Sequence, residues 1–313
     1  MSAPRARVSP LQSIVALTFV TGMLWLLFSP ASPVNKAPEA GAPAAREHAP
    51  EVAPAAVVTP RPRVASTSPA ITDSLVALGL AEHVVGRSPF CRSVPEAVPV
   101  VGDLRDFDAE RLALVAPDVL FVQPPLAGVD PALRDFCAVK RIPLVDRRLD
   151  SLAELDGLVD DIASAFRIAP DASGEGLAKR LADAKAALAP TVAPAAGAPR
   201  TLLLVSAEPF LAVGRGSYLD ELLSRSGAAN ALERDGYVEL GAEAIVALAP
   251  ARVLIVAETD RGAARALELL RALPWPDERT PPMAARAVPE LLSPSLAAVA
   301  RAGVLGELAS EAR

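Results

Sequence analysis

Hydrophobic and polar residues follow a pattern along this chain that occurs twice. Residues 109–122 read AERLALVAPDVLFV, and residues 242–256 read AEAIVALAPARVLIV. In each copy a glutamate opens a short apolar segment with helical spacing, Ala-Pro ends it, and a β-branched run typical of a buried strand follows. Two copies of one helix–strand unit predict two similar α/β lobes. A cleft between such lobes is a common place for a ligand to bind.

Strand and helix patterns alternate from residue 63 onward, which predicts an α/β fold with mainly parallel strands. Strands are expected at residues 63–67, 84–87, 98–101, 119–122, 142–146, 201–206 and 253–258. Helices are expected at residues 69–78, 130–138, 151–167 and 176–189, besides the two repeated ones. A further helix begins at Ser217, which forms a capping box with Asp220. Residues 259–285 carry no clear pattern, and the tail reads as a short strand followed by a final helix.

The pattern divides this region into three parts. Residues 63–169 are expected to form an N-terminal α/β lobe and residues 199–313 a C-terminal one, with a connecting helix and turn over residues 170–198. The helix expected at residues 176–189 spans over about 20 Å, at about 1.5 Å per residue, which is enough to bridge two lobes. Because a long helix bends only at a cost, the two lobes are expected to close little around a ligand.

The chain before residue 63 differs from the rest in composition and is not expected to belong to the folded lobes. Residues 1–10 contain Arg5 and Arg7 and are expected to stay in the cytoplasm, and residues 11–28 are apolar enough to enter a membrane. We interpret them as an uncleaved signal anchor, with a cleaved signal peptide as the alternative. No cysteine follows, which excludes a lipoprotein anchor. Residues 29–62 are rich in proline and alanine and are expected to form a semi-extended linker to an exported domain.

The composition of the chain argues against several kinds of partner and metal site. The net charge of −6 and the lack of a basic patch argue against a nucleic-acid partner. Two histidines cannot build a multi-histidine metal site, and no metal site or cofactor of the protein itself is expected. Cys91 and Cys137 lack metal-binding spacing. Two separate buried thiols are the favoured interpretation, and a disulfide in an oxidising compartment is the alternative.

Several segments, in this order, resemble the cobalamin and iron-chelate solute-binding proteins of ABC importers, the class with a helical backbone. The segments are RVASTSPAITDSLVALGLAEHVVGRSPFC, VPVVGDLRDFDAERLALVAPDVLFV, VGRGSYLDELLSRSGAAN and LGAEAIVALAPARVLIV. The resemblance covers about residues 63–313 and implies two α/β lobes joined by one long rigid helix, with the ligand between them. The tail departs from the pattern, because Ser293-Pro294 stands where the family has Gly-Pro.

The resemblance implies an extracytoplasmic receptor that delivers a cobalamin-like corrinoid or an iron chelate, such as a siderophore or heme, to an importer. Ligands of open α/β sheets bind near the carboxyl ends of the strands. The residues expected to line the site are Ser68, Pro69, Phe90, Cys91, Asp103, Pro124, Pro125, Leu126, Phe210, Arg215, Ser217, Tyr218 and Glu258. Taken singly, each is better explained as an ordinary turn, cap or core residue, whereas for the set as a whole a ligand-lining role is about as well supported.

Some of these side chains suit particular parts of such a ligand. Phe90, Phe210 and Tyr218 could pack against a flat macrocycle. The arginines suited to carboxylates of the ligand are Arg147, Arg148 and Arg215. Tyr218 and Cys91 are the candidates for direct contact with iron.

Glu110 and Glu243 are the candidates for docking. Each lies in the first turn of its repeated helix and, by helical spacing, faces water. In the family, one exposed glutamate per lobe meets arginines of the importer's membrane subunits, and the resemblance gives Glu110 and Glu243 that role. The alternative is a favourable interaction with the helix dipole.

Two rival functions remain open. One is an enzyme with its active site in the cleft between the lobes, for which Asp103 and Glu258 are the only titratable pair at hand. The other is a tethered interaction domain without a small ligand. The sequence lacks a nucleophile elbow, a Walker loop and an HExxH motif, which argues against the enzyme.

Overall fold

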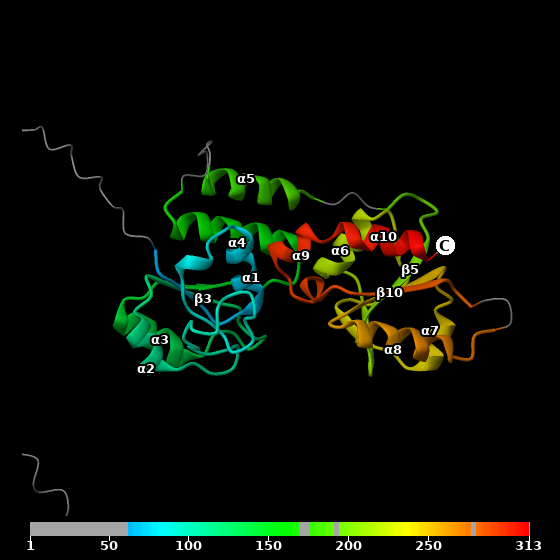
Figure 1. Cartoon of the computed structure of the whole chain (residues 1–313), viewed down its shortest axis with the longest axis horizontal. Helices are drawn as coiled ribbons and strands as arrows, with labels where there is room; N and C mark the ends of the chain where they lie inside the picture. The colour runs from blue at the N-terminus through cyan, green and yellow to red at the C-terminus, as the bar shows by residue number, and fades with distance from the viewer. Residues whose placement is uncertain (1–61, 169–175, 191–193, 277–279, 313) are drawn as a thin grey trace, which may run out of the picture. The chain divides into compact units, whose positions relative to one another are not determined.

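The computed structural model describes residues 62–168, 176–190, 194–276 and 280–312. Within them the chain forms two α/β lobes, the first coloured blue to green and the second yellow to red in Figure 1. The first lobe has a sheet of four parallel strands in the order β2-β1-β3-β4. Its strands are β1 (Val64–Ser66), β2 (Val84–Gly86), β3 (Val119–Val122) and β4 (Leu144–Asp146). Its helices are α1 (Pro69–Ala77), α2 (Ala109–Val115) and α3 (Pro131–Lys140), with a 3₁₀ turn η1 (Ala81–His83).

The second lobe has a mixed sheet in the order β10-β9-β5-β6-β8, with β7 paired to β5. Its strands are β5 (Arg200–Ala207), β6 (Phe210–Val213), β7 (Ala229–Asn230), β8 (Tyr237–Glu239), β9 (Arg252–Ala257) and β10 (Met283–Ala287). Its helices are α6 (Tyr218–Arg225), α7 (Ala242–Ala247), α8 (Asp260–Arg271), α9 (Leu296–Ala300) and α10 (Gly303–Glu311), with a 3₁₀ turn η2 (Pro289–Leu292). Strand β6 is antiparallel to both β5 and β8.

Most elements expected from the sequence are present, and the repeated helix–strand unit recurs as α2–β3 and α7–β9. Three expectations were wrong. Residues 98–101 form only an isolated bridge, Val100 to Arg87, because Pro99, between Val98 and Val100, has no N–H to donate and interrupts the ladder. The second sheet is less parallel than expected, because β5 turns back into β6. The tail holds two helices, α9 and α10, where one was expected.

Two helices pack side by side above the first lobe, at the upper left in Figure 1, α4 (Leu152–Ala165) and α5 (Leu177–Ala187). The ammonium group of Lys185 on α5 pairs with carboxylates of Asp156 and Asp160 on α4. The buried stripe of α4 is the one its spacing predicts, and it consists of Leu152, Leu155, Leu158, Val159 and Ile162. The expected boundary between residues 169 and 170 lies outside the described residues, and the one between residues 198 and 199 falls just before β5.

Helix α6 holds one end of this helix pair. The carboxylate of Glu221 accepts a hydrogen bond from the backbone N–H of Leu152, at the start of α4, with an N to O distance of 3.1 Å. One turn later, the guanidinium of Arg225 donates to the carbonyls of Ala187 and Ala189, at the end of α5, over 2.5 and 2.6 Å. An acid at a helix start and a base at a helix end both suit the helix dipole. Helix α6 therefore ties both helices to the second lobe.

The C-terminal segment makes a further link between the lobes. Helix α9 packs against α1 of the first lobe and against α5. The backbone N–H of Leu296, at the start of α9, donates to the hydroxyl of Ser74 on α1 over 3.1 Å. The chain then returns, and α10 packs against β9, β10 and α6 of the second lobe. This excursion and the helix pair α4–α5 both join the two lobes, and one hydrophobic core runs through residues of both.

Candidate functional site

The candidate site begins where strands β1 and β3 of the first lobe end. Ser68 is fully buried and caps α1 by accepting a hydrogen bond from the backbone N–H of Ile71. Its hydroxyl donates to the side-chain carbonyl of Gln123, just after β3, over 2.8 Å. Pro69 starts the helix in the position where a missing N–H costs least. Ser68 thus links the ends of β1 and β3, and Pro69 starts the helix that follows β1.

The loop after β2 is held rigidly by a buried arginine. The guanidinium of Arg87 donates to the backbone carbonyls of Val98, Ser88 and Glu96 at 3.0, 3.1 and 3.2 Å. Since these bonds fix both arms of the loop, the residues at its tip have a defined position. Phe90 lies there with 64% of its surface exposed.

Cys91, the next residue, points the other way. It is buried, and its Sγ atom lies 3.1 Å from the hydroxyl oxygen of Thr72. Burial raises the pKa of the Cys91 thiol, so the side chain stays protonated and is a poor ligand for iron. Cys91 and Cys137 are both free and buried, in agreement with the favoured interpretation of two separate thiols.

A shallow hollow lies at the carboxyl ends of β1 and β3. Its walls include the expected Asp103, Pro124 and Pro125. The Asp103 carboxylate accepts hydrogen bonds from the backbone N–H groups of Arg105 (2.7 Å) and Asp106 (3.1 Å), so it shapes its own turn. Two apolar side chains of these loops face solvent, Leu104 with 45% of its surface exposed and Leu126 with 87%.

A second, open hollow of about 340 Å³ lies in the second lobe. It is lined by Val205, Leu211, Tyr218, Leu219, Tyr237 and Leu292. Tyr218 is 2% exposed, and its hydroxyl donates to the carbonyl of Leu291 over 2.6 Å. Burial raises the pKa of the Tyr218 phenol, and interaction with Tyr237 adds to the rise. Tyr237 keeps 46% of its surface exposed and is the more accessible of the two phenols.

The other residues expected in the second lobe are mostly engaged locally. Ser217 is buried and caps α6, with its hydroxyl donating to the carbonyl of Gly214. The expected capping box is incomplete, since the Asp220 carboxylate accepts from the N–H of Gly216 and not from Ser217. Arg215 is exposed beside Glu233 at 3.5 Å. Phe210 begins β6 and packs against the core of its own lobe.

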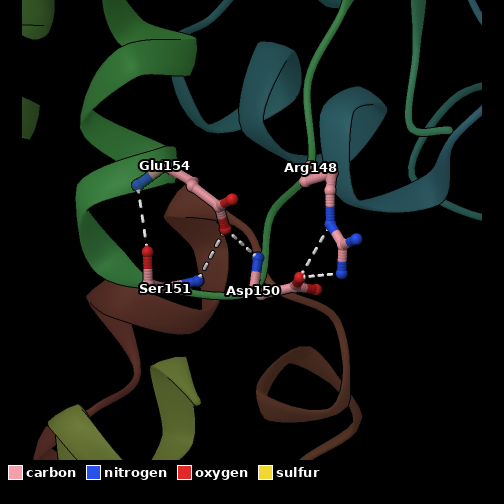
Figure 2. A network of polar contacts seen from close by, with 4 residues as sticks. All are labelled: Arg148, Asp150, Ser151 and Glu154. Atoms are coloured by element: carbon pink, nitrogen blue, oxygen red, sulfur yellow. Dashed lines mark hydrogen bonds and ion pairs between the residues drawn. The ribbon is translucent and has the colours of Figure 1, made fainter. Parts of the chain in front are cut away.

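Figure 2 shows the polar contacts of the segment that leads from β4 into α4. Ser151 and Glu154 form a complete capping box, and the Glu154 carboxylate also accepts from the N–H of Asp150. Arg148 pairs with the carboxylate of Asp150 (Figure 2). Arg147 pairs with Asp161 of α4, which is the main reason that its pKa is raised. All three arginines expected to meet ligand carboxylates, Arg215 included, therefore have carboxylate partners within the fold.

One ion pair bridges the two lobes. The guanidinium of Arg92, at the tip of the loop after β2, lies 2.8 Å from a carboxylate oxygen of Glu258, which directly follows β9. Both side chains are well exposed, 84% for Arg92 and 57% for Glu258. Among the ion pairs of the described residues, this is the one that joins the first lobe to the second.

The known proteins that match the chain agree with this architecture. The family model of the periplasmic binding proteins matches residues 64–272, which is more than half of the chain. The chain belongs to the periplasmic binding protein family. No curated protein sequence matches this family member significantly.

Solved structures of periplasmic binding proteins share its fold. The heme-binding protein HutB of Vibrio cholerae is 18% identical over 80% of this chain and 99% of its own, with a TM-score of 0.61. The heme-binding protein BhuT, solved with two hemes, is 21% identical over 80% and 98%, with a TM-score of 0.60. The vitamin B12-binding protein BtuF of Vibrio cholerae is 15% identical over 80% and 97%, with a TM-score of 0.55. The matching family and these three proteins are binding proteins.

In this periplasmic binding protein, the sequence analysis did not single out two exposed apolar residues that line these hollows, Leu104 and Tyr237. Leu104 stands alone among charged residues in the loop GDLRD, and such an isolated leucine in a polar turn is the signal that could have revealed it. Tyr237 opens the edge strand β8, which the strand pattern did not predict. Across the described residues, no helix is long and apolar enough to span a membrane, and no three metal-ligating side chains gather. Residues 1–28, where a membrane segment was expected, lie outside that part of the chain.

Proposed function

We propose that this chain is the extracytoplasmic substrate-binding component of an ABC importer, and that its ligand is a flat, largely apolar metal chelate of the heme class. The observation that carries the proposal is the position of the exposed apolar side chains. Six large apolar residues are strongly exposed in the described part of the chain. Phe90, Leu104 and Leu126 lie in the loops at the carboxyl ends of the first sheet, and Tyr237 lines the hollow of the second lobe.

A macrocycle suits these side chains physically. Single exposed apolar residues are common on protein surfaces, but a group at the strand ends of an α/β fold marks a binding surface. Covering a phenylalanine or leucine side chain fully contributes about 1.5–3 kcal/mol. Aromatic rings such as Phe90 and Tyr237 add favourable offset stacking on a flat partner.

The two rival functions have less support. An enzyme would need Asp103 and Glu258 to act together, but Asp103 holds its own turn and Glu258 pairs with Arg92. An interaction domain without a small ligand would also use exposed apolar side chains, but solved structures that share this fold include proteins named for binding heme or vitamin B12. The fold alone does not choose among heme, corrinoids and siderophores, since its relatives include proteins that bind heme and vitamin B12.

The location and the partner are part of the proposal. Residues 11–28 tether the binding lobes to the outer face of the cytoplasmic membrane, with residues 29–62 as the spacer. The apolar run after Arg5 and Arg7 supports this orientation. The membrane subunits of the importer are the protein partners, and they meet Glu110 and Glu243.

Removing single apolar side chains tests the ligand surface. Phe90→Ser and Leu126→Ser should each weaken heme binding by about tenfold, which corresponds to losing part of the burial of one side chain. Leu114→Ser and Val139→Ser are the matched controls, because both residues are exposed apolar side chains on the helices α2 and α3. The measurement is the dissociation constant from a heme absorbance titration. If the two test variants and the two control variants weakened heme binding equally, the proposed surface would be contradicted.

A further inference from the structure

The ion pair between Arg92 and Glu258 has a position that no other described pair shares. Each of Arg147, Arg148 and Arg215 has its carboxylate partner within the same lobe or on the adjoining helix. Arg92 has its partner on the opposite lobe, 166 residues away in the sequence. A ligand that inserts between the lobes at the strand ends therefore meets this pair, whereas the other pairs can persist beside it.

Both partners stand on rigid supports. Arg92 follows Phe90 and Cys91 on the loop that Arg87 clamps through three backbone carbonyls. Glu258 follows the last residue of the buried strand β9, Ala257, whose carbonyl accepts from the N–H of Val288. The loop after β2 thus presents an exposed ring at Phe90 and a guanidinium at Arg92 within two residues. A flat ligand with a carboxylate at its edge could use both.

We propose that Arg92 is the residue that binds a carboxylate of the ligand, and that Glu258 is an internal anion that occupies Arg92 until the ligand arrives. This inference rests on the proposed function, since it specifies the chemistry of the ligand edge in the same site. The ligand class is an apolar chelate with a peripheral carboxylate, such as the propionate of heme.

Electrostatics explains how a ligand can displace Glu258 from Arg92 and how Glu258 still influences ligand affinity. Exposed ion pairs are weak in water and are further weakened by salt, so Glu258 can be displaced. A ligand that fills the cleft removes water, and a guanidinium–carboxylate bond is stronger in the drier site. After the exchange, Glu258 lies near the ligand with its own negative charge. Glu258 thereby lowers the affinity for carboxylates in general, and only a ligand with enough apolar contact overcomes the competition.

Two charge-neutralising substitutions with opposite expected effects test the exchange. Glu258→Gln removes the competitor, so heme should bind about two- to fivefold more tightly, the factor that matches loss of an exposed ion pair. Arg92→Gln removes the binding group, so heme should bind about tenfold more weakly. Lys179→Gln and Asp183→Asn are the controls, because they remove the same charges from an exposed pair within α5. Neither control should change heme affinity.

The decisive comparison uses heme and its dimethyl ester, which lacks the carboxylates, with the purified 313-residue chain. The ester should bind the wild-type chain, Arg92→Gln and Glu258→Gln with dissociation constants within twofold of one another. High salt should reduce the difference between wild type and Glu258→Gln for heme. A wild-type chain that binds heme and a Glu258→Gln variant that binds it no more tightly would overturn the exchange alone. A wild-type chain that binds neither heme nor the ester would overturn the proposed function together with it.

Discussion

Asp73 on α1 shows how single residues in the contact between the lobes respond to their surroundings. The side chains of Ser93, in the first lobe, and Ser293, just before α9, interact with its carboxylate and favour the ionised form. Burial raises the pKa of Asp73 above its usual value, these interactions partly oppose the rise, and the nearby charge of Glu290 adds to it. The folded protein therefore holds the Asp73 proton more tightly than the unfolded chain does.

This pKa shift predicts a pH dependence of stability. Because the folded pKa is raised, the ionised carboxylate opposes folding at neutral pH, and this opposition fades as the pH falls through the folded pKa. Asp73→Asn, which keeps the shape and most hydrogen-bonding capacity, should be more stable than wild type at pH 7. The difference should shrink as the pH is lowered toward about 4, near the usual carboxyl pKa of 3.8. Urea unfolding of both proteins at the two pH values measures it, and a difference that grows on acidification would contradict the argument.

The positions of some residues could be predicted from the sequence, whereas the directions of their side chains could not. A strand pattern followed by a turn indicated that Phe90, Asp103 and Leu126 lie at the carboxyl ends of the first sheet, and the structure has them there. The same pattern could not tell which way a side chain points. Tyr218 and Cys91 follow the pattern equally well, but long-range partners, Leu291 and Thr72, hold them inside. Whether any of these residues contacts a ligand remains a prediction.

Helices α2 and α7 carry the proposed docking glutamates. Glu110 and Glu243 are exposed in the first turns of these helices, and neither makes an ion pair with a described residue. Asp108 already caps α2 by accepting from the N–H of Arg111, whereas α7 begins at Gly241 without a side-chain cap. A helix-dipole role thus explains Glu243 better than Glu110. Docking to the importer explains why both lobes have the same exposed acid.

Charge reversal of these glutamates tests docking. The variant with Glu110→Lys and Glu243→Lys should lose binding to the importer's membrane subunits while keeping its heme affinity within twofold. Stability should fall by about 0.3–1 kcal/mol per site at most, since each acid gains only that much from the helix dipole. The control carries Asp135→Lys and Asp260→Lys, which reverse one exposed acid on α3 and one on α8. Full importer binding by the Glu110/Glu243 variant would leave both glutamates as helix-start residues only.

Two elements that the sequence analysis did not predict differ in their cause. Helix α8 buries Ala263, Ala266 and Leu270 opposite a strongly polar face, so its helical period is distinct and could have been predicted. Strand β6 has four residues and follows β5 after two residues, so the two strands read as one interrupted run. The repeated units α2–β3 and α7–β9 were predictable because their leucine, isoleucine and valine positions stand out.

The connection of the two lobes is a property of the whole molecule. The sequence predicted one helix between them, and the structure adds the packing of α5 on α4, the mounting of both helices on α6, and the return of α9 to the first lobe. These links join residues that are tens to hundreds of positions apart, so no local pattern in the sequence predicts them. Two connections should restrict lobe movement more than one does, which agrees with the expectation of a small closure on ligand binding.

The central claim is that the strand ends of the two lobes form a site for a flat apolar chelate with a peripheral carboxylate. The most direct measurement is an equilibrium titration of the purified 313-residue chain with heme, cyanocobalamin and a ferric hydroxamate chelate, followed by ligand absorbance and protein fluorescence. The account predicts a heme dissociation constant of about 1 μM or lower, corresponding to about −8 kcal/mol, with the other two at least tenfold weaker. Tighter binding of cyanocobalamin or the hydroxamate chelate than of heme, or no saturable heme binding, would contradict it.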